Sequence, residues 1–383
     1  MSDIPLLLAA LALAIWLYLL FARGFFWLPR IAPPAPPPGS WPSVAVVVPA
    51  RDEAAAIAQS IGSLLAQDYV GPFSVVLVDD HSSDGTAALA RAAAAASGRA
   101  QCLTVIAARP LPRGWTGKMW ALAEGVRSLE ETGRPAELLL FTDADIAHHP
   151  GNVSELVARL EEKGRDLVSL MALLRCRSAA ERWLIPAFVF FFAMLYPFAW
   201  ANDPRKQIAA AAGGCILVRR SAYERSGGHA AIRSALIDDC ALARRVKAGG
   251  PIWIGLTRQV RSLRPYPSIA ELWRMVARTA FTQLGYSPWL LLGTVLGLGL
   301  TFLAPSLLLL AGGAVAWIAG AAWLAMAVAY APMLRFYGVS PLRAPLLPAV
   351  AAIYLAATLD SARRHWRGVG GAWKGRVQWQ SQR

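Results

Sequence analysis

The sequence predicts an α/β domain with a mostly parallel β-sheet, attached to a membrane by an N-terminal anchor and C-terminal helices. Between residues 44 and 250, short apolar runs typical of buried strands alternate with helical, often Ala-rich stretches. An apolar run at residues 4–22 is long enough to cross a bilayer, and further apolar runs follow residue 285. At 383 residues, one large domain or two smaller ones are expected.

Composition and charge favour a membrane protein over a nucleic-acid-binding protein. The chain is 56% hydrophobic and has a formal net charge of +14, which suits anionic lipid headgroups. Nucleic acid is the other usual partner of a basic chain, but the sequence has no interleaved basic and aromatic patch that would support it. The 4 cysteines are far apart and lack CxxC spacing. They indicate reduced thiols in cytosolic surroundings, not disulfides or a zinc site.

Residues 1–30 are expected to form an uncleaved transmembrane anchor. The apolar run lacks the basic start and the small-residue cleavage site of a signal peptide. Arg23 and Arg30 follow it and no basic residue precedes it, so the following domain is expected in the cytoplasm. The Pro-rich residues 31–43 predict a stiff spacer between membrane and domain.

Residues 286–361 predict C-terminal membrane helices, with a basic cytoplasmic tail at 362–383. Residues 289–310 and 314–334 each suit a spanning helix. Residues 345–359 fall short of the usual spanning length, and a crossing there would place the basic tail outside. We therefore expect a re-entrant or interfacial segment at this position.

A further apolar stretch, residues 184–200, interrupts the predicted α/β domain, which is expected to span residues 44–285. The stretch contains two prolines and five phenylalanines. A crossing here would place the two halves of the domain on opposite sides of the membrane. It is therefore expected to lie in the membrane interface or to line a groove for an acceptor.

Polar turns with carboxylates follow the first two predicted strands. Residues 44–48 lead into the turn at residues 49–53, and residues 73–78 lead directly into Asp79 and Asp80. In open α/β sheets, ligands bind at the carboxyl ends of the strands, so these turns are candidate binding segments. The sequence after the first strand is neither a GxGxxG fingerprint nor a Walker loop, so those nucleotide sites are not indicated.

The stretch at residues 138–146, LLLFTDADI, delivers Asp143 and Asp145 to the end of another predicted strand. Two carboxylates one residue apart can share a hard divalent cation such as Mg²⁺ or Mn²⁺, which often lies between carboxylates and phosphates. Two solvated loop aspartates are the alternative for so short a motif.

Lys118, near a predicted helix start, is a candidate diphosphate contact, with a solvated surface lysine as the alternative.

Two more candidate segments lie later in the chain. Gly213 and Gly214 interrupt the apolar run at residues 209–218, and such a pair either allows close approach of the backbone to a ligand or marks a bulge. Asp238 and Asp239 open a predicted helix. Asp239 is a candidate general base, or only a helix-start residue favoured by the helix dipole. Spacing alone does not separate the two aspartates.

These motifs together resemble one enzyme family. Five of them occur in its order, with a TGK turn between the second and third: VVVPARDEA, VDDHSSDGT, FTDADI, GGCILVRR and IDDCALARRVKAGG. The chain from about Val44 to Gly250 resembles the inverting family 2 glycosyltransferases, which have the GT-A fold, a Rossmann-like nucleotide-sugar-binding α/β domain. GWTGKMWAL, ERWLIPAFVFFFAMLYPFAW and MVARTAFTQL resemble, more narrowly, the hopene-associated glycosyltransferases of hopanoid-producing bacteria, relatives of ceramide glucosyltransferase.

The resemblance implies a bacterial inner-membrane enzyme with its catalytic domain facing the cytoplasm. It would move a sugar from a nucleotide sugar, expected to be UDP-linked, to a membrane lipid. The resemblance places this reaction in hopanoid or related glycolipid biosynthesis. The reaction would invert the anomeric carbon and use Mg²⁺ or Mn²⁺. A polyprenyl-phosphate sugar transferase or polysaccharide synthase of the same fold is the first alternative. A non-catalytic scaffold that binds nucleotide sugars is the alternative from another class.

The resemblance also assigns roles to single residues. Asp143 and Asp145 would form the metal-binding pair, with Asp145 the surest metal contact, and Asp239 would be the general base. Lys118 would lie near the diphosphate or sugar. Residues expected to hold the nucleotide are Pro49, Ala50, Arg51, Glu53, Asp79 and Asp80.

The sequence departs from the family pattern at two places. Asp238 stands where relatives have Glu, and together with Gly213 and Gly214 it is a candidate acceptor or diphosphate contact. Arg278 matches the arginine of a Q/R-x-x-R-W motif, but Met275 and Thr279 replace its other members. This argues against polymer synthesis and leaves Arg278 as an acceptor or diphosphate contact.

Overall fold

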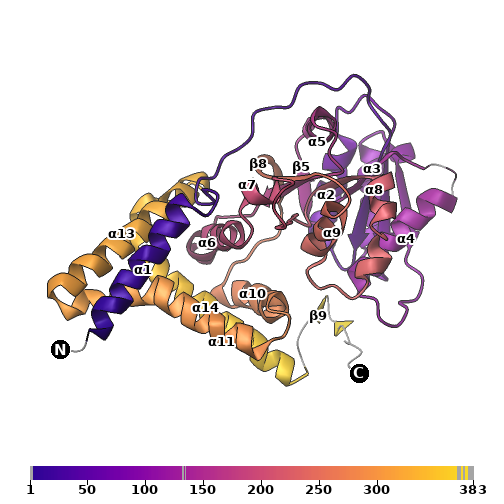
Figure 1. The fold of residues 1–383 in the computed structure, drawn as a ribbon. Helices are drawn as coiled ribbons and strands as arrows, with labels where there is room; N and C mark the ends of the chain where they lie inside the picture. The colour runs from indigo at the N-terminus through magenta and orange to yellow at the C-terminus, as the bar shows by residue number, and fades with distance from the viewer. Residues whose placement is uncertain (1–2, 132, 134, 369–371, 374–375, 378–383) are drawn as a thin grey trace. The chain divides into compact units, whose positions relative to one another are not determined.

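The computed structural model describes residues 3–131, 133, 135–368, 372–373 and 376–377 and divides into two compact units (Figure 1). The helical unit comprises Met1–Pro29, Cys176–Ala199 and Tyr266–Gly371, and the α/β unit comprises Arg30–Arg175, Trp200–Pro265 and Ala372–Arg383. The sequence predicted that the α/β domain ends at residue 285, whereas this division assigns the residues after Pro265 to the helical unit. The reason is that the helix after residue 268 packs on the last helix of the helical unit.

The α/β unit is built on an eight-stranded sheet with the order β3-β2-β1-β4-β7-β6-β8-β5. Neighbours β1–β2, β1–β4, β2–β3 and β6–β8 are parallel, and β4–β7, β6–β7 and β5–β8 are antiparallel. This arrangement confirms the predicted α/β class. The strands are β1 Val44–Ala50, β2 Phe73–Asp79, β3 Leu103–Ala107, β4 Leu138–Phe141, β5 Ile146–His148, β6 Leu167–Leu173, β7 Ile216–Arg219 and β8 Ile252–Ser262.

Helices cover both faces of this sheet, which explains why β1 is an unbroken apolar run buried along its whole length. Val44, Val46 and Val48 share a core with α2, α3 and α5, whereas Ala45 and Val47 share a second core with α4, α8 and α9. These helices are α2 Ala54–Leu65, α3 Thr86–Ala96, α4 Gly117–Glu131, α5 Asn152–Glu162, α8 Arg220–Arg225 and α9 Asp238–Lys247.

Helix α4 approaches the sheet closely because it carries a glycine at its contact point. A side chain at Gly125 would place its Cβ 2.3 Å from Val47 Cγ1 and 3.1 Å from Val78 Cγ2, closer than two such atoms can lie. The missing side chain therefore lets α4 lie directly on β1 and β2. This packing brings the first turn of α4, with Lys118, to the carboxyl end of the sheet.

Two predicted strands differ from the observed ones. The stretch at residues 138–146 splits into β4 and β5, which are joined by the turn that carries the two aspartates. The run at residues 209–218 contributes only its end to the sheet, because β7 begins at Ile216 after the Gly213-Gly214 turn. The paired glycines thus precede a strand and do not form a bulge within one.

The Pro-rich spacer is held against the α/β unit over part of its length. The Ala35 amide donates to both carboxylate oxygens of Glu155 at 3.2 and 3.0 Å, and Arg159 donates to the Pro33 carbonyl. Both side chains come from α5. The segment is therefore extended, as its prolines predict, and is fixed to the domain by α5.

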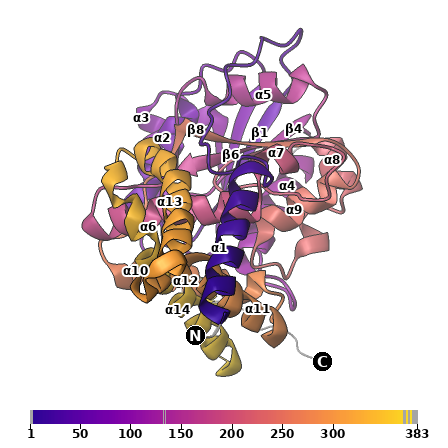
Figure 2. The same cartoon turned by 60° about the vertical axis from the view of Figure 1, so that its left-hand side comes forward.

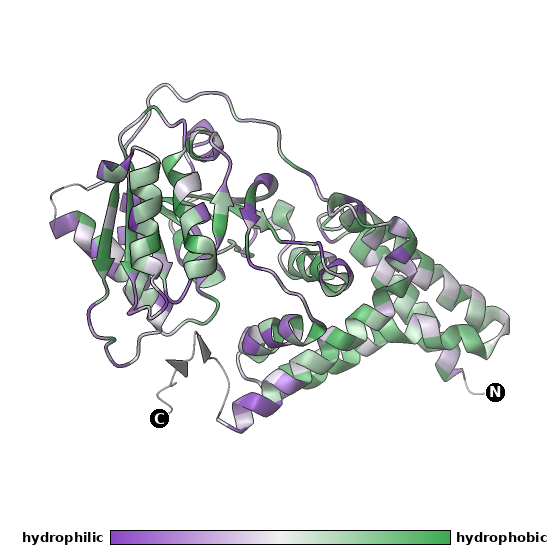
Figure 3. Cartoon of the chain, turned by 180° about the vertical axis from the view of Figure 1, so that it is seen from behind, coloured by the Kyte–Doolittle hydropathy of each residue, from purple (hydrophilic) through white to green (hydrophobic). Residues whose placement is uncertain are grey.

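Among its described residues, the helical unit contains four segments that are long and apolar enough to cross a membrane: Ile4–Phe21, Pro288–Ala311, Gly313–Phe336 and Pro341–Trp366. Their predominantly apolar character is visible as green ribbon in Figure 3. Helices α1 and α13 pack side by side (Figure 2). The helices of this unit are α1 Ile4–Phe21, α6 Ala179–Leu195, α10 Ile269–Gln283, α11 Pro288–Leu298, α12 Ala304–Leu308, α13 Gly313–Phe336 and α14 Leu347–Trp366.

The last apolar segment is longer than its sequence indicated. The expectation of a short segment at residues 345–359 is wrong in length, because a 3-10 turn at Pro341–Leu346 and helix α14 make it 26 residues long. Polar residues in the last turns of α14 extend the helix beyond the apolar run. The first residues of the predicted tail are thus helical, and residues 369–371, 374–375 and 378–383 lie outside the described residues. Its re-entrant or interfacial placement stays a prediction.

Helix α6, from the apolar stretch at residues 184–200, packs through its phenylalanines inside the helical unit. Phe190 meets Phe26 and Tyr330 with ring centroids 5.2 and 5.3 Å apart, and Phe191 meets Tyr354 at 5.1 Å. Such aromatic pairs add to the free energy gained by burial. The predicted interfacial or groove-lining role of this stretch stays a prediction, but these two rings serve helix packing.

Candidate active site

The carboxyl ends of β1, β2 and β4 meet at one edge of the sheet, because these neighbouring strands are parallel. The turn after β1 is tied to the turn after β2 by the Asp80 amide, which donates to the Ala50 carbonyl at 2.8 Å. The turn after β4 begins beside β1, where the Thr142 amide donates to the Val47 carbonyl at 3.3 Å. The structure therefore brings the three predicted binding segments together.

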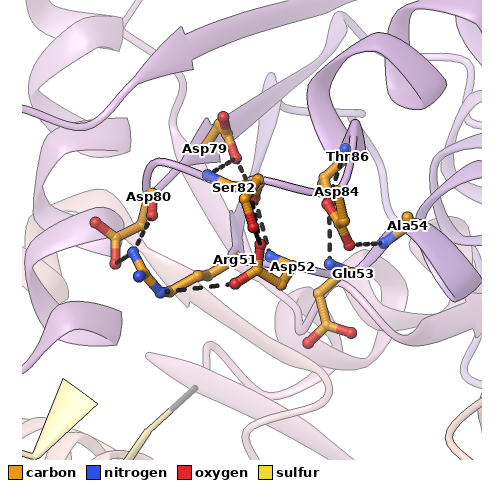
Figure 4. A network of polar contacts seen from close by, with 10 residues as sticks. Arg51, Asp52, Glu53, Ala54, Asp79, Asp80, Ser82, Asp84 and Thr86 are labelled. Carbon is orange, nitrogen blue, oxygen red and sulfur yellow. Dashed lines mark hydrogen bonds and ion pairs between the residues drawn. The ribbon is translucent and has the colours of Figure 1, made fainter. Parts of the chain in front are cut away.

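Side chains of the β1 and β2 turns bond to one another in a dense network (Figure 4). Arg51 Nη1 donates to the Asp80 carbonyl at 2.6 Å and lies 3.5 Å from its carboxylate. The Ser83 amide donates to Asp52 Oδ1 at 2.8 Å, and the Ser82 amide donates to Asp79 Oδ1 at 3.3 Å. Asp52 has a φ of 49°, a left-handed conformation that these bonds support.

Lys118 connects the β4 turn to the start of α9. Its Nζ lies 2.9 Å from Asp143 Oδ1 and 3.0 Å from Asp238 Oδ2. Burial alone would lower the pKa of Lys118, but the carboxylates of Asp143 and Asp238 raise it above its ordinary value, so the ammonium stays charged. Its position at the start of α4 brings a fixed positive charge to a region rich in carboxylates.

Asp239 is held by backbone amides instead of by a cation. The Gly213 amide donates to Asp239 Oδ2 at 3.0 Å, and the Cys240 amide donates to Oδ1 at 2.7 Å. Enclosure by protein and, after it, the neighbouring carboxylate of Asp238 raise the pKa of Asp239 to about 6, against the opposing effects of Lys118 and the two amides. This environment distinguishes Asp239 from Asp238, which spacing could not do.

Gly213 lies close to the charged side chains of the site. A Cβ there would lie 3.2 Å from Lys118 Nζ and 3.7 Å from a carboxylate oxygen of both Asp143 and Asp239. The backbone of the glycine turn thus lies close to three charged side chains, and its approach to a ligand stays a prediction. A small cavity opens beside it, lined by Lys118, Leu122, Phe141, Thr142, Asp143, Gly213, Ile216, His229, Asp238, Asp239 and Leu242.

Asp145 is paired with an arginine that the sequence analysis did not single out. Arg264 Nε donates to Asp145 Oδ2 at 2.7 Å, and Arg264 Nη2 donates to Glu53 Oε1 at 2.8 Å. Arg264 follows β8 directly, 119 residues after Asp145 in the chain. The sequence carries no local signal for this pair, because the pairing of β5 with β8 brings the two together.

The comparisons with known proteins agree with this geometry. A family model described as glycosyl transferase family 2 matches residues 45–227. This match covers just under half of the chain. The match supports the predicted assignment as a glycosyltransferase, and the matched residues include the three strand-end turns and the glycine turn. The hopene-associated subgroup and the relation to ceramide glucosyltransferase stay predictions.

Two curated relatives of this glycosyltransferase domain are called N-acetylglucosaminyltransferases. The protein from Rhizobium leguminosarum bv. viciae is 27% identical over 187 residues, which cover 47% of this chain and 40% of that protein. The protein from Mesorhizobium japonicum is 28% identical over 211 residues, covering 52% of this chain and 46% of that protein. The chain thus matches less than half the length of these relatives.

A solved structure shows a similar fold over nearly the whole chain. It is a mannosyltransferase from Pyrobaculum calidifontis in complex with GDP-Man and Mn²⁺. The two share 21% sequence identity with a TM-score of 0.55, and the match covers 94% of this chain and 98% of the mannosyltransferase. At this identity, the likeness concerns the fold, and it confirms the predicted GT-A architecture.

Asp143 and Asp145 fit a hard divalent cation by their chemistry. Both offer carboxylate oxygens from a single turn, and each already attracts a protein cation, Lys118 or Arg264. Within the part of the chain that the structure describes, no group of three or more His, Cys, Asp or Glu side chains could hold a metal ion. Asp143 and Asp145 would supply two of the oxygen ligands, and Mg²⁺ commonly takes others from water and a substrate's phosphates.

Arg278 is the predicted site residue that the α/β unit does not contain. It lies on α10 in the helical unit and its side chain is exposed. Its suggested contact with an acceptor or diphosphate stays a prediction.

The sequence did not predict a buried hydrogen-bond network next to the aspartate turn. Thr142 Oγ1 donates to the Gly214 carbonyl at 2.7 Å and lies 2.9 Å from His148 Nε2. Because the hydroxyl has one proton, His148 Nε2 must carry a hydrogen and donate, while Nδ1 accepts from Asn152 at 3.0 Å. Burial lowers the pKa of His148 to about 4, so the ring is neutral at physiological pH. The network joins the aspartate turn to the glycine turn.

Replacing Thr142 with Val is expected to destabilise the domain by about 2 kcal/mol, because it leaves the Gly214 carbonyl and a His148 N–H buried without partners. Thr142→Ser keeps the hydroxyl and should lose less stability. Denaturant unfolding of the detergent-solubilised full chain, followed by Trp fluorescence, measures the difference. Equal stability of the two variants would contradict a structural role for this hydroxyl.

Proposed function

We propose that this protein is a membrane-bound inverting glycosyltransferase that moves a sugar from a nucleotide sugar to a membrane lipid. The observation that carries the proposal is Asp239, a carboxylate with a raised pKa, held by the Gly213 amide beside the Lys118–Asp143 pair. Asp239, as a base, and Lys118, as a charged group for the donor, line the same small cavity. A single displacement at a sugar carbon needs both a base for the acceptor and a charged group that binds the leaving diphosphate.

In the proposed reaction, Asp239 removes the proton from the acceptor hydroxyl as its oxygen attacks the anomeric carbon. Hydrogen bonds from the Gly213 and Cys240 amides orient the carboxylate for this step. A pKa raised to about 6 makes the base stronger than an ordinary aspartate while leaving it ionised at pH 7. The attack breaks the bond to the nucleoside diphosphate from the opposite face, and the anomeric centre inverts.

Lys118 and the Asp143–Asp145 turn would hold the departing diphosphate. The Lys118 ammonium lies beside Asp143 and remains charged, so it can neutralise a phosphate oxygen. A divalent cation bound by Asp145 and Asp143, Mg²⁺ or Mn²⁺, would supply Lewis-acid stabilisation of the leaving group. Support for this cofactor comes from the oxygen donors themselves and from the fold shared with a mannosyltransferase whose structure contains Mn²⁺.

The nucleotide is proposed to bind at the β1 and β2 turns. Arg51, Asp79 and Asp80 are already oriented there by the network of Figure 4. Such a pre-formed turn reduces the ordering that binding requires. The remaining proposed contacts with the donor nucleotide are Pro49, Ala50 and Glu53, and those with the acceptor or diphosphate are Gly213, Gly214, Asp238 and Arg278.

A lipid acceptor is proposed because the same chain carries four helices suited to a membrane. A net charge of +14 also favours a surface of anionic lipid. On the resemblance of three sequence stretches, a hopanoid or a ceramide-like lipid is the first acceptor class to test. The proposed location is the bacterial inner membrane, with the catalytic domain on the cytoplasmic side.

The proposal is tested with the full chain in lipid nanodiscs, Mn²⁺ and radiolabelled UDP-glucose, UDP-N-acetylglucosamine or GDP-mannose. Vesicles containing a hydroxylated hopanoid or ceramide supply the acceptor. We expect label to enter the organic phase as a lipid carrying one sugar, with an equal amount of nucleoside diphosphate released. Mass spectrometry identifies the lipid, and NMR shows whether the anomeric configuration has inverted.

Other outcomes separate the competing functions. Label in a water-soluble polymer retained on a gel would replace the proposal with a polysaccharide synthase. Label released from the lipid by mild acid would indicate a polyprenyl-phosphate acceptor. Nucleotide-sugar binding without transfer to any of these acceptors would favour a non-catalytic scaffold.

A further inference from the structure

Arg264 occupies an unusual place between two carboxylates from different turns. Its Nε binds Asp145 Oδ2 at 2.7 Å and its Nη2 binds Glu53 Oε1 at 2.8 Å. The side chains of Asp145 and Glu53 are only 14% and 15% exposed, whereas that of Arg264 is 35% exposed. The arginine therefore closes this pair of carboxylates from the solvent side.

The backbone places Arg264 at Asp145. Strand β5 pairs with β8 in antiparallel fashion, with Ile146 opposite Ser262. The Leu263 amide then donates to the Asp145 carbonyl at 2.8 Å. The base of the arginine side chain is thus anchored by main-chain bonds, while its outer part can turn toward solvent without disrupting the sheet.

The charges of the site divide between two protein cations. Lys118 lies against Asp143 and Asp238, and Arg264 lies against Asp145 and Glu53. A guanidinium that uses two different nitrogens on two carboxylates makes charge-assisted hydrogen bonds, which are stronger than neutral ones. Arg264 therefore neutralises the same carboxylate that the proposed function assigns to a metal ion.

We propose that Arg264 is the resting counter-cation of Asp145 and competes with the divalent cation for this carboxylate. The inference rests on the proposed function, which makes Asp145 a metal ligand. A divalent cation held by Asp145 Oδ2 would replace the Nε bond of Arg264, while the Nη2 bond to Glu53 would keep the guanidinium close by. Arg264 is thus a positioning residue that weakens binding of the metal alone.

The test measures binding of Mn²⁺ alone to the detergent-solubilised full chain, from the EPR signal of the free ion. R264Q is expected to bind Mn²⁺ about fivefold more tightly than the wild type, the factor appropriate to a partly exposed ion pair. The matched control is R261Q, which removes the same charge three residues away. Arg261 is exposed and donates to the Arg258 carbonyl, so its loss reports only the general change in charge.

The outcomes distinguish this inference from the proposed function. R264Q with an affinity equal to or weaker than that of R261Q overturns the competition, provided that D145N loses Mn²⁺ binding. Binding of Mn²⁺ that D145N leaves unchanged, or no binding by either the wild type or R264Q, overturns the metal site and this inference with it. A fold control is the melting temperature of R264Q, and R264M supplies a second uncharged side chain if R264Q unfolds.

Discussion

Asp239→Asn is expected to lower the turnover of sugar transfer by about a thousandfold, the middle of the range for loss of a general base. An asparagine can still accept the Gly213 amide proton through its side-chain oxygen but gives up the bond from the Cys240 amide, so the melting temperature of this variant serves as its fold control. The asparagine cannot take a proton from the acceptor. Binding of the nucleotide sugar, measured by calorimetry, should therefore change little.

The matched control for this variant is Asp238→Asn. Asp238 is the neighbouring carboxylate, but its Oδ2 lies 3.0 Å from Lys118 Nζ, so we place it in charge balance and not in proton transfer. Its loss should affect binding of the donor more than turnover. If Asp238→Asn instead lost as much turnover as Asp239→Asn, or more, the assignment of the base would move to Asp238.

The same residue determines the expected pH dependence. The base works only when ionised, and its pKa is raised to about 6. Activity should therefore be steady above this pH and fall as the pH drops through it, about tenfold per unit at lower pH. The pH profile of kcat/KM between pH 5 and 8 measures this limb. A limb near pH 4, as for an ordinary aspartate, would contradict the environment described for Asp239.

Asp145→Asn is the second substitution with a large expected effect, a loss of at least about a hundredfold in metal-dependent turnover. A metal ion contributes several kcal/mol to stabilising a leaving diphosphate, and each 1.4 kcal/mol is about a tenfold change in rate. An amide is a poor ligand for Mg²⁺ or Mn²⁺ compared with a carboxylate. The loss should appear as a higher Mn²⁺ concentration for half-maximal activity, and chelation with EDTA should remove wild-type activity.

Asp68→Asn provides the control for this second variant. Asp68 is an exposed aspartate of the same unit that accepts a hydrogen bond from Ser154 at 3.0 Å, and it lies outside the candidate site. Its substitution should leave the Mn²⁺ dependence unchanged. Full turnover of Asp145→Asn in the presence of EDTA would rule out a metal at this turn.

Much of the fold could be predicted because its signals are local. The apolar runs at the starts of β1 and β2 predicted those strands to within a residue or two, since strands buried on both faces need continuous hydrophobic side chains. The start of helix α9 was predicted at Asp238 and Asp239. The long apolar helices followed from length and hydrophobicity alone.

Residues that depend on distant partners could not be predicted in this way. Helix α14 proved longer than its apolar run, because its polar last turns pack against α10 and do not need apolar character. The hydrogen bonds of Thr142 and His148 to Gly214 and Asn152 join three separate segments. No periodicity of the sequence records such a network.

The sequence by itself placed carboxylates at the ends of adjacent parallel strands, and this determined where the site would lie. Strand order and backbone approach then decided what each carboxylate does. Only the tertiary structure distinguishes Asp239 from Asp238, because the Gly213 amide binds Asp239 and Lys118 binds Asp238. Arg264 met Asp145 only through the pairing of β5 with β8, because contacts between distant segments are set by the sheet and not by neighbouring residues.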